Sequence, residues 1–242
     1  MCREVSLLKV NELSIYSKEI NLLSPLSFEL TAGQLTGVIG ASGSGKSLLA
    51  QALLGSVPRG FTLSGEVSLP QGQRVALSAQ SASVLDPLRR VISQLMRRIS
   101  PGADNRVSQL QTVNISRKIA ACYPHQLSGG MAKKALLAQA TWQQTDFVVA
   151  DEPCCGLDTS SATELYEYLA RLASEERRGI LVISHNLKHL LTVADDILVL
   201  KEGRLVEKTT PDKILKGLCA PYTYALWQAI PGNWGRTDAA VA

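Results

Sequence analysis

Residues 40–47, GASGSGKS, have the composition and spacing of a phosphate-binding loop. They fit the pattern G-x-x-x-x-G-K-[S/T] at every fixed position. Glycines allow backbone N–H groups to turn inward around phosphate oxygens, and a helix that begins at Lys46 would direct its positive end at the same charge. We therefore predict an ATP site in which Lys46 reaches the β- and γ-phosphates and the Ser47 hydroxyl holds Mg²⁺. A chance glycine turn is the alternative.

Two carboxylates end the apolar run at residues 146–152, DFVVADE. An apolar run without alternation is typical of a strand in a parallel sheet that is covered on both faces. Asp151 would then emerge at the carboxyl end of the strand, where it could hold Mg²⁺ directly or through water. Glu152 could orient and deprotonate the attacking water, a role that typically contributes about 10²–10⁴-fold. For Glu152 the alternative is an acid at a helix N-terminus.

Two further polar residues close strand-like runs. His185 ends LVISH, and ligands in α/β sheets gather at the carboxyl ends of neighbouring parallel strands. A lone histidine is more often structural, but His185 could hydrogen-bond the γ-phosphate or the attacking water. Gln80 follows RVALSAQ, and its amide could bind water or Mg²⁺, although a glutamine alone is weak evidence.

A second glycine segment raises a question, because residues 128–130 of YPHQLSGGMAKKA are also small enough to approach a phosphate closely. A helix N-terminus that follows small residues is an anion site. Ser128 would also serve as an ordinary N-cap, and the two roles are compatible. One site does not need two phosphate-directed segments.

The elements that must position these residues can be read from the pattern. Short alternating runs over residues 5–39 indicate strands, LTGVIG leads into the phosphate loop, and KSLLAQALLGSV has helical spacing. Strands return around GEVSLPQGQRVALSAQ. A mostly helical insert is expected at about 85–140, interrupted at 100–105 and by CYPHQLSGG. A helix over 161–176, a buried strand in GILVISHN and a hairpin over 194–208 follow, and the tail at about 232–242 is expected to be loose.

Composition limits the classes of function. The chain has 242 residues, 45% of them hydrophobic, which suits one domain with a subdomain. Its net charge of +4 is too small to argue for nucleic acid. The basic stretch at residues 88–100 is interpreted as a solvated helix face. Five cysteines without C-x-x-C spacing indicate reduced thiols. No apolar run is long enough for a signal peptide or a membrane span, so a membrane role would depend on a partner.

The motifs together are more specific than any one of them. With GASGSGKS, Gln80, LSGGM, VVADEP, GLD and His185 in this order, the chain resembles the ATP-binding subunit of an ABC transporter over about residues 5–231. The resemblance implies an α/β P-loop NTPase fold with a RecA-like core, an N-terminal antiparallel β subdomain and an inserted helical subdomain, all within one domain at 1–242. It also implies that two such subunits meet head to tail. Each ATP then lies between one subunit's phosphate loop and the other's LSGG segment.

Residue roles follow from the resemblance. Catalysis is assigned to Lys46, Glu152 and His185, and Mg²⁺ to Ser47, Gln80 and Asp151. Tyr16 would stack on adenine, unless it is an ordinary strand tyrosine. Four residues would point toward the ATP of a partner subunit, namely Ser128, Gly129, Gly130 and Asp158 of GLD. The implied ATP-binding set is Tyr16, Gly40, Ala41, Ser42, Gly43, Ser44, Gly45, Lys46, Ser47, Leu48 and Gln80.

Three segments narrow the resemblance further. SVLDPL, YPHQLSGGM and PYTYALWQAIP look like importer ATPases for oligopeptides, dipeptides and nickel or metal–chelate complexes. Many peptide members carry a cysteine-rich C-terminal segment that is absent here, which favours the shorter nickel and metallophore type. The implied partners are a second ATP-binding subunit, two membrane-spanning permease subunits docked on the helical insert and the Gln80 loop, and indirectly an extracytoplasmic binding protein. The implied location is peripheral, on the cytoplasmic face of the inner membrane.

Other readings remain open from the residues alone. They are an ABC exporter ATPase, a soluble ABC ATPase acting on DNA or ribosomes, and a nucleotide sensor that does not hydrolyse. The chain also departs from the family pattern at Met131, at AKK 132–134, at Cys154 and at Asn186. These positions leave the metal and base residues intact. They favour a divergent member, one of two unequal ATPases in a heterodimer.

Overall fold

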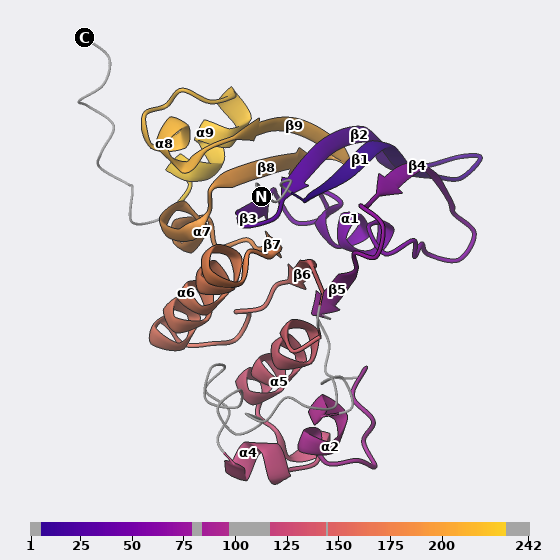
Figure 1. Ribbon diagram of the computed structural model, residues 1–242. Helices are drawn as coiled ribbons and strands as arrows, with labels where there is room; N and C mark the ends of the chain where they lie inside the picture. Colours follow the sequence, from indigo (N-terminus) through magenta and orange to yellow (C-terminus); the bar gives the residue numbers. More distant parts are fainter. Residues whose placement is uncertain (1–5, 79–83, 97–116, 144, 231–242) are drawn as a thin grey trace, which may run out of the picture.

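The computed structural model describes residues 6–78, 84–96, 117–143 and 145–230, arranged around two sheets (Figure 1). A three-stranded antiparallel sheet has the order β2-β1-β4, and a six-stranded sheet has the order β5-β6-β7-β3-β8-β9. The strands are β1 Leu7–Tyr16, β2 Asn21–Thr31, β3 Leu35–Ile39, β4 Thr62–Ser68, β5 Val75–Ser78, β6 Phe147–Asp151, β7 Gly179–Ile183, β8 Asp196–Lys201 and β9 Arg204–Thr209.

Helices account for most of the remaining described chain. They are α1 Lys46–Ala52, α2 Val91–Met96, α4 Arg117–Ala121, α5 Gly129–Thr141, α6 Thr159–Glu176, α7 Leu187–Val193, α8 Pro211–Leu215 and α9 Pro221–Gln228, with a 3₁₀ turn at Pro124–Gln126. In the described part of the chain, none of them combines the length and apolarity that a membrane crossing requires.

The six-stranded sheet forms the centre of the molecule. Its strands β5, β6, β7, β3 and β8 are parallel, and β9 returns antiparallel to β8. Every residue of β3, β6 and β7 is buried, because both faces of the sheet are covered. The sequence predictions of two buried parallel strands and of a late hairpin are confirmed.

Alternate residues of the buried strands face different cores. Val148 and Val182 pack with residues of α5, α6 and α7, whereas Val149 and Leu181 pack with residues of α1 and the antiparallel sheet. Helices therefore cover one face of the central sheet, and α1 with the antiparallel sheet covers the other, as Figure 1 shows. The expected α/β fold with an N-terminal antiparallel β subdomain is confirmed.

The strands expected around residues 65–80 are β4 and β5, which belong to different sheets. β4 pairs with β1, and β5 pairs with β6. At the β1–β4 irregularity Glu12 has a φ of 48°, and Gly65 has a φ of 90°. A Cβ on Gly65 would lie 2.3 Å from the carbonyl oxygen of Glu12, so only glycine fits this close approach.

The helical insert contains α2, α4 and the beginning of α5, which lie together below the sheets in Figure 1. Val91, Leu95, Ala120 and Ala135 belong to one buried cluster, and α5 continues from it onto β5 and β6. Helix α5 therefore joins the insert to the central sheet. Residues 97–116, where the break at 100–105 was expected, and the tail at 232–242 lie outside the described residues.

Candidate functional site

The phosphate loop (residues 40–47) joins β3 to α1 with the backbone geometry that its glycines permit. Gly43 and Gly45 have φ values of 77° and 98°, in the left-handed region. Gly40 has no room for a side chain, since a Cβ there would lie 2.2 Å from the Leu200 carbonyl oxygen. A pocket of about 290 Å³ opens at the loop, lined by residues 42–48 and Glu152. The predicted loop is therefore formed, with its pocket beside a strand end.

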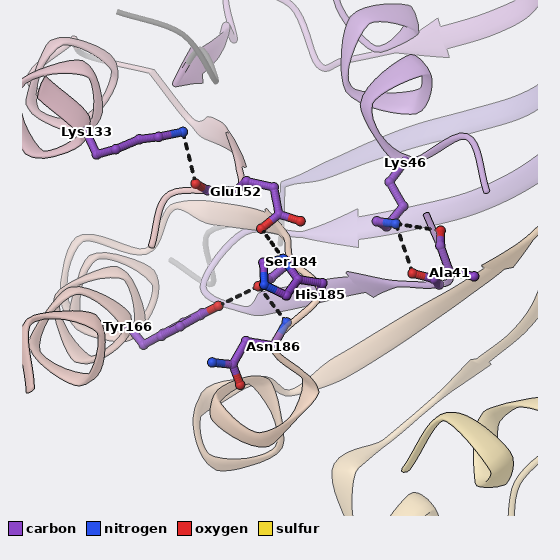
Figure 2. Close-up of polar contacts among 9 residues, drawn as sticks. Ala41, Lys46, Lys133, Glu152, Tyr166, Ser184, His185 and Asn186 are labelled. Carbon is purple, nitrogen blue, oxygen red and sulfur yellow. Dashed lines mark hydrogen bonds and ion pairs between the residues drawn. The ribbon is translucent and has the colours of Figure 1, made fainter. Parts of the chain in front are cut away.

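Lys46 folds back over its own loop (Figure 2). Its Nζ donates to the carbonyl oxygens of Gly40 and Ala41, each at 2.9 Å. Burial lowers the pKa of Lys46, and the nearby carboxylates of Glu152 and Asp151 oppose that shift. The Lys46 side chain thus places its positive charge at the opening of the loop. When an anion enters, Lys46 can exchange its two carbonyl contacts for contacts to that anion.

Asp151, the last residue of β6, carries a buried carboxylate with spare capacity. It is 6% exposed and lies beside Ser47, while its Oδ1 has no hydrogen-bond partner among the described residues. Burial raises the pKa of Asp151 above its usual value, against the effect of the Ser47 side chain. A buried carboxylate oxygen without a partner is costly, and a cation would satisfy it.

The Ser47 hydroxyl and the Asp151 carboxylate are the hard oxygen ligands that Mg²⁺ prefers. No group of three or more His, Cys, Asp or Glu that could hold a metal occurs among the described residues. That is compatible with Mg²⁺, which is usually held by one or two protein oxygens together with phosphates and water. The residues present therefore fit this ion when a nucleotide is bound.

Glu152 and His185 meet at the ends of the adjacent strands β6 and β7 (Figure 2). His185 Nδ1 lies 2.9 Å from Glu152 Oε2, and the Glu152 side chain is 13% exposed whereas that of His185 is 69% exposed. Glu152 adopts a φ of 49°, and its N–H donates to the Ile183 carbonyl at 2.9 Å. This turn out of the sheet directs the carboxylate into the pocket of the phosphate loop.

Three residues that sequence reasoning missed support this pair. Lys133 of α5 donates from Nζ to the Glu152 carbonyl oxygen at 3.2 Å. Tyr166 of α6 donates to Ser184 Oγ at 2.8 Å, and Ser184 Oγ also accepts from the Asn186 N–H at 3.0 Å (Figure 2). The turn that carries His185 is thereby tied to α6. Sequence alone gives no signal for these contacts, because their partners lie 18 or 19 residues away on other elements.

The second glycine segment lies at the start of α5 and is not among the residues that line the pocket. Ser128 is the N-cap, and its Oγ accepts from the Met131 N–H at 3.3 Å. Asp158 caps α6 by accepting from the Ser161 N–H at 2.9 Å, and this hydrogen bond lowers the pKa of Asp158. A Cβ on Gly130 would lie 2.7 Å from Leu157, so the two segments are in contact.

Of three further predicted ATP contacts, Tyr16 and Leu48 are described in the structure and Gln80 is not. Tyr16 is the last residue of β1 and is 40% exposed, so its ring is accessible for stacking. Leu48 is half-buried and lines the pocket. Gln80 lies outside the described residues, and its place in the site stays a prediction.

Comparison with known proteins agrees with this geometry. The family model described as ABC transporter matches residues 23–155, which is 133 of the 242 residues. The oligopeptide transport ATP-binding protein of Salmonella typhimurium is 29% identical, covering 93% of this chain and 76% of its own. The dipeptide transport ATP-binding protein of Haemophilus influenzae is 27% identical, covering 94% of this chain and 78% of its own.

Solved structures have the same fold. An ATP-binding subunit of an ABC transporter superposes with a TM-score of 0.76 at 25% identity, covering 91% of this chain and 98% of its own. A dimeric ATP-binding cassette in a post-hydrolysis state with ADP and phosphate superposes with a TM-score of 0.72 at 20% identity, covering 84% and 98%. The predicted P-loop NTPase fold of the cassette type is confirmed.

Proposed function

The chain belongs to the ABC transporter family, and on this premise we propose that it is the ATP-hydrolysing subunit of an importer whose permease is made by separate subunits. One observation carries the proposal. The Glu152 carboxylate lines the pocket of the phosphate loop, and the His185 imidazole lies 2.9 Å from it. A carboxylate oriented by an imidazole next to a phosphate loop is suited to activating water for phosphoryl transfer.

Binding of ATP would use the loop and its lysine. Residues 42–48 line the pocket, and their backbone amides would donate to phosphate oxygens. Lys46 would exchange its contacts with Gly40 and Ala41 for phosphate oxygens. Ser47 and Asp151 would hold Mg²⁺, which neutralises charge on the phosphates. Asp151 Oδ1, which has no hydrogen-bond partner within the described ranges, supports this assignment. Tyr16 and Gln80 are proposed contacts to adenine and to the Mg²⁺ shell.

Hydrolysis would proceed by in-line attack of water on the γ-phosphorus, with cleavage of its bond to the bridging oxygen of the β-phosphate, so that ADP leaves and inorganic phosphate forms. Glu152 would accept the proton of the attacking water, with its carboxylate held by His185. Lys46 and the loop amides would stabilise the negative charge that develops on the transferred phosphoryl group. The Lys133 contact to the Glu152 carbonyl would keep the backbone turn at φ 49° in place.

A second ATP-binding subunit would complete each site. Residues 128–130 do not line this chain's own pocket, yet they form the N-terminus of α5 beside the Asp158 segment. In a head-to-tail pair both segments would face the partner's ATP. The solved cassette with ADP and phosphate is dimeric, which supports such a pair. The helical insert and the loop at residue 80 are the proposed docking surface for two permease subunits, at the cytoplasmic face of the membrane.

Peptides are the proposed cargo, because the relatives compared are named for oligopeptide and dipeptide transport. A nickel or metal–chelate cargo was favoured from the sequence. These relatives give it no support, and it stays a prediction. Cargo would be selected by an extracytoplasmic binding protein and the permease, since the fold of an ATPase does not itself choose a substrate.

The proposed function is tested by turnover of the complex purified with a tagged chain from detergent-solubilised native membranes. Glu152→Gln should lower kcat for ATP by about 10²–10⁴-fold while ATP is still bound, because only the proton acceptor is lost. Glu167→Gln, at an exposed position of α6, is the matched control and should leave kcat unchanged. Glu152→Gln turning over at the wild-type rate would refute the role of Glu152. Recovery of the chain without membrane-spanning partners would refute the importer.

A further inference from the structure

Beyond the motifs of the ATP site, the phosphate loop has a contact with the C-terminal end of the described chain. The Ala41 N–H donates to the hydroxyl of Tyr222 at 3.2 Å, across 181 residues of sequence. Tyr222 lies in the first turn of α9, outside residues 23–155 that the family model matches. We propose that Tyr222 is a positioning residue for the phosphate loop, and that α8 and α9 set the affinity of the loop for ATP through this residue. This inference rests on the proposed function.

Tyr222 is itself held in place. Its ring lies under the Lys201 ammonium, with Nζ 5.1 Å from the ring centroid, and Lys201 ends β8. A cation over an aromatic face is a favourable contact that fixes the plane of the ring. The hydroxyl therefore approaches Ala41 from a ring whose orientation is set by the central sheet.

Helix α9 is attached to β9 by one carboxylate. Glu207 Oε1 accepts from the Ala220 N–H at 2.8 Å and from the hydroxyl of Thr223, which is completely buried. Both donors flank Tyr222 in sequence. Glu207 thus fixes the start of α9 relative to the sheet, and with it the position of the Tyr222 ring. Figure 1 shows α8 and α9 beside β8 and β9.

The same side of the phosphate loop is supported by the turn between β8 and β9. The Gly203 N–H donates to the Ser44 carbonyl at 3.1 Å, and Gly40 packs directly on the Leu200 carbonyl. Tyr222 extends this support to the first turn of the loop. The β8–β9 hairpin and α9 together contact the loop at Gly40, Ala41 and Ser44.

The Tyr222 contact gains importance when ATP enters. Ala41 is held at its N–H by Tyr222 and at its carbonyl by Lys46. Lys46 must leave that carbonyl to reach a phosphate, whereas Tyr222 can stay. Without the hydroxyl, the first turn of the loop would have to be ordered at the moment of binding, and the entropy of that ordering would weaken affinity.

The test is ATP affinity of the purified complex with Tyr222→Phe, which keeps the ring over Lys201 and removes only the hydroxyl. The dissociation constant and the KM for ATP should rise about two- to tenfold, the range of one net hydrogen bond. The kcat should be unchanged, and the melting temperature without nucleotide should fall only slightly, because a single exposed hydrogen bond is lost. Tyr224→Phe removes a hydroxyl from the same helix, where the ring packs on Trp227, and should change neither constant.

A second pair of variants examines the attachment of α9. Thr223→Val loses the hydroxyl that binds Glu207 and should also raise the KM for ATP, whereas Thr223→Ser retains a hydroxyl and should restore it. Wild-type affinity in Tyr222→Phe, or an equal loss in Tyr224→Phe, would overturn the inference alone. A wild-type complex that binds no ATP would overturn the proposed function, and the inference with it.

Discussion

At the scale of single residues, the site contains a buried carboxylate, that of Asp151, which lowers the stability of the fold. Asp151 is buried at the end of β6, and one of its carboxylate oxygens has no hydrogen-bond partner in the part of the chain that the structure describes. Its raised pKa indicates that the charged form is disfavoured in the folded protein. Such a group is expected where stability is given up for binding, which here is the proposed binding of Mg²⁺ with the phosphates of ATP.

Replacing Asp151 by Asn should therefore stabilise the chain while weakening Mg²⁺-dependent ATP binding. Removing the buried charge should raise the melting temperature without nucleotide or divalent cation, by about 2–4 °C for each kcal/mol gained. Because the folded pKa is raised, the wild-type penalty is present above that pKa and disappears as the pH falls through it. The difference between the two proteins should narrow in acid.

The measurement is thermal unfolding in EDTA at neutral and acidic pH. Asp212→Asn is the control, because Asp212 is exposed in the first turn of α8. Asp212→Asn should not raise the melting temperature as Asp151→Asn does. A melting temperature of Asp151→Asn at or below the wild type at neutral pH would contradict the interpretation of Asp151 as a strained functional group.

The sequence was sufficient for the residues whose place follows from strand ends. Asp151, Glu152 and His185 each end a buried run, and parallel neighbouring strands bring such ends together. Tyr166 and Lys133 could not be predicted, because their roles depend on which helix packs beside which strand. The identities of Asp151, Glu152 and Lys46 were predictable, but their local geometry was not. The sequence does not show that Asp151 has an oxygen without a described partner, that Glu152 has a positive φ, or that Lys46 folds back onto its own loop.

At the scale of elements, the turn between β7 and α7 determines where His185 lies. Ser184 Oγ is the centre of that turn, accepting from Tyr166 and from the Asn186 N–H. Burial raises the pKa of Tyr166, so its hydroxyl remains protonated and able to donate. Helix α6 thus positions the turn by a hydrogen bond that is protected from water.

Tyr166→Phe should lower kcat for ATP several-fold with little change in KM, because the loosened turn presents His185 to Glu152 less well. The lost hydrogen bond should also destabilise the fold by about 0.5–1.5 kcal/mol. Tyr168→Phe is the matched control, because the Tyr168 hydroxyl of the same helix donates a buried hydrogen bond to Thr141, away from the site. It should lose similar stability and keep kcat. Equal kcat values in the two variants would exclude a role of Tyr166 in positioning.

Most elements were predictable from periodicity, and the exceptions have a physical reason. The central strands are apolar runs between turns, and α6 has a clear amphipathic pattern. The separation of β4 from β5 was missed, because strand propensity does not specify a pairing partner. Helices α8 and α9 were also missed. They are short and are held by tertiary contacts such as Glu207 to Thr223.

At the scale of the whole molecule, the chain has two segments that are predicted to bind phosphate, and they do not line the same pocket. Residues 42–48 and Glu152 line the pocket, and residues 128–130 lie elsewhere, at the start of α5. Helix α5 reaches from the helical insert to the central sheet, where Lys133 contacts Glu152. In the proposed assembly with a permease and a second ATP-binding subunit, movement of the helical insert would therefore be transmitted through α5 to Glu152, the proposed catalytic carboxylate.

The central claim is that this chain binds ATP through its phosphate loop, and a titration with ATP tests it most directly. Wild type should bind, and Lys46→Ala should bind at least about tenfold more weakly, because a charge-assisted contact to phosphate is lost. Lys216→Ala, at an exposed position after α8, is the control and should bind as the wild type does. Equal affinity in Lys46→Ala and wild type would contradict the account.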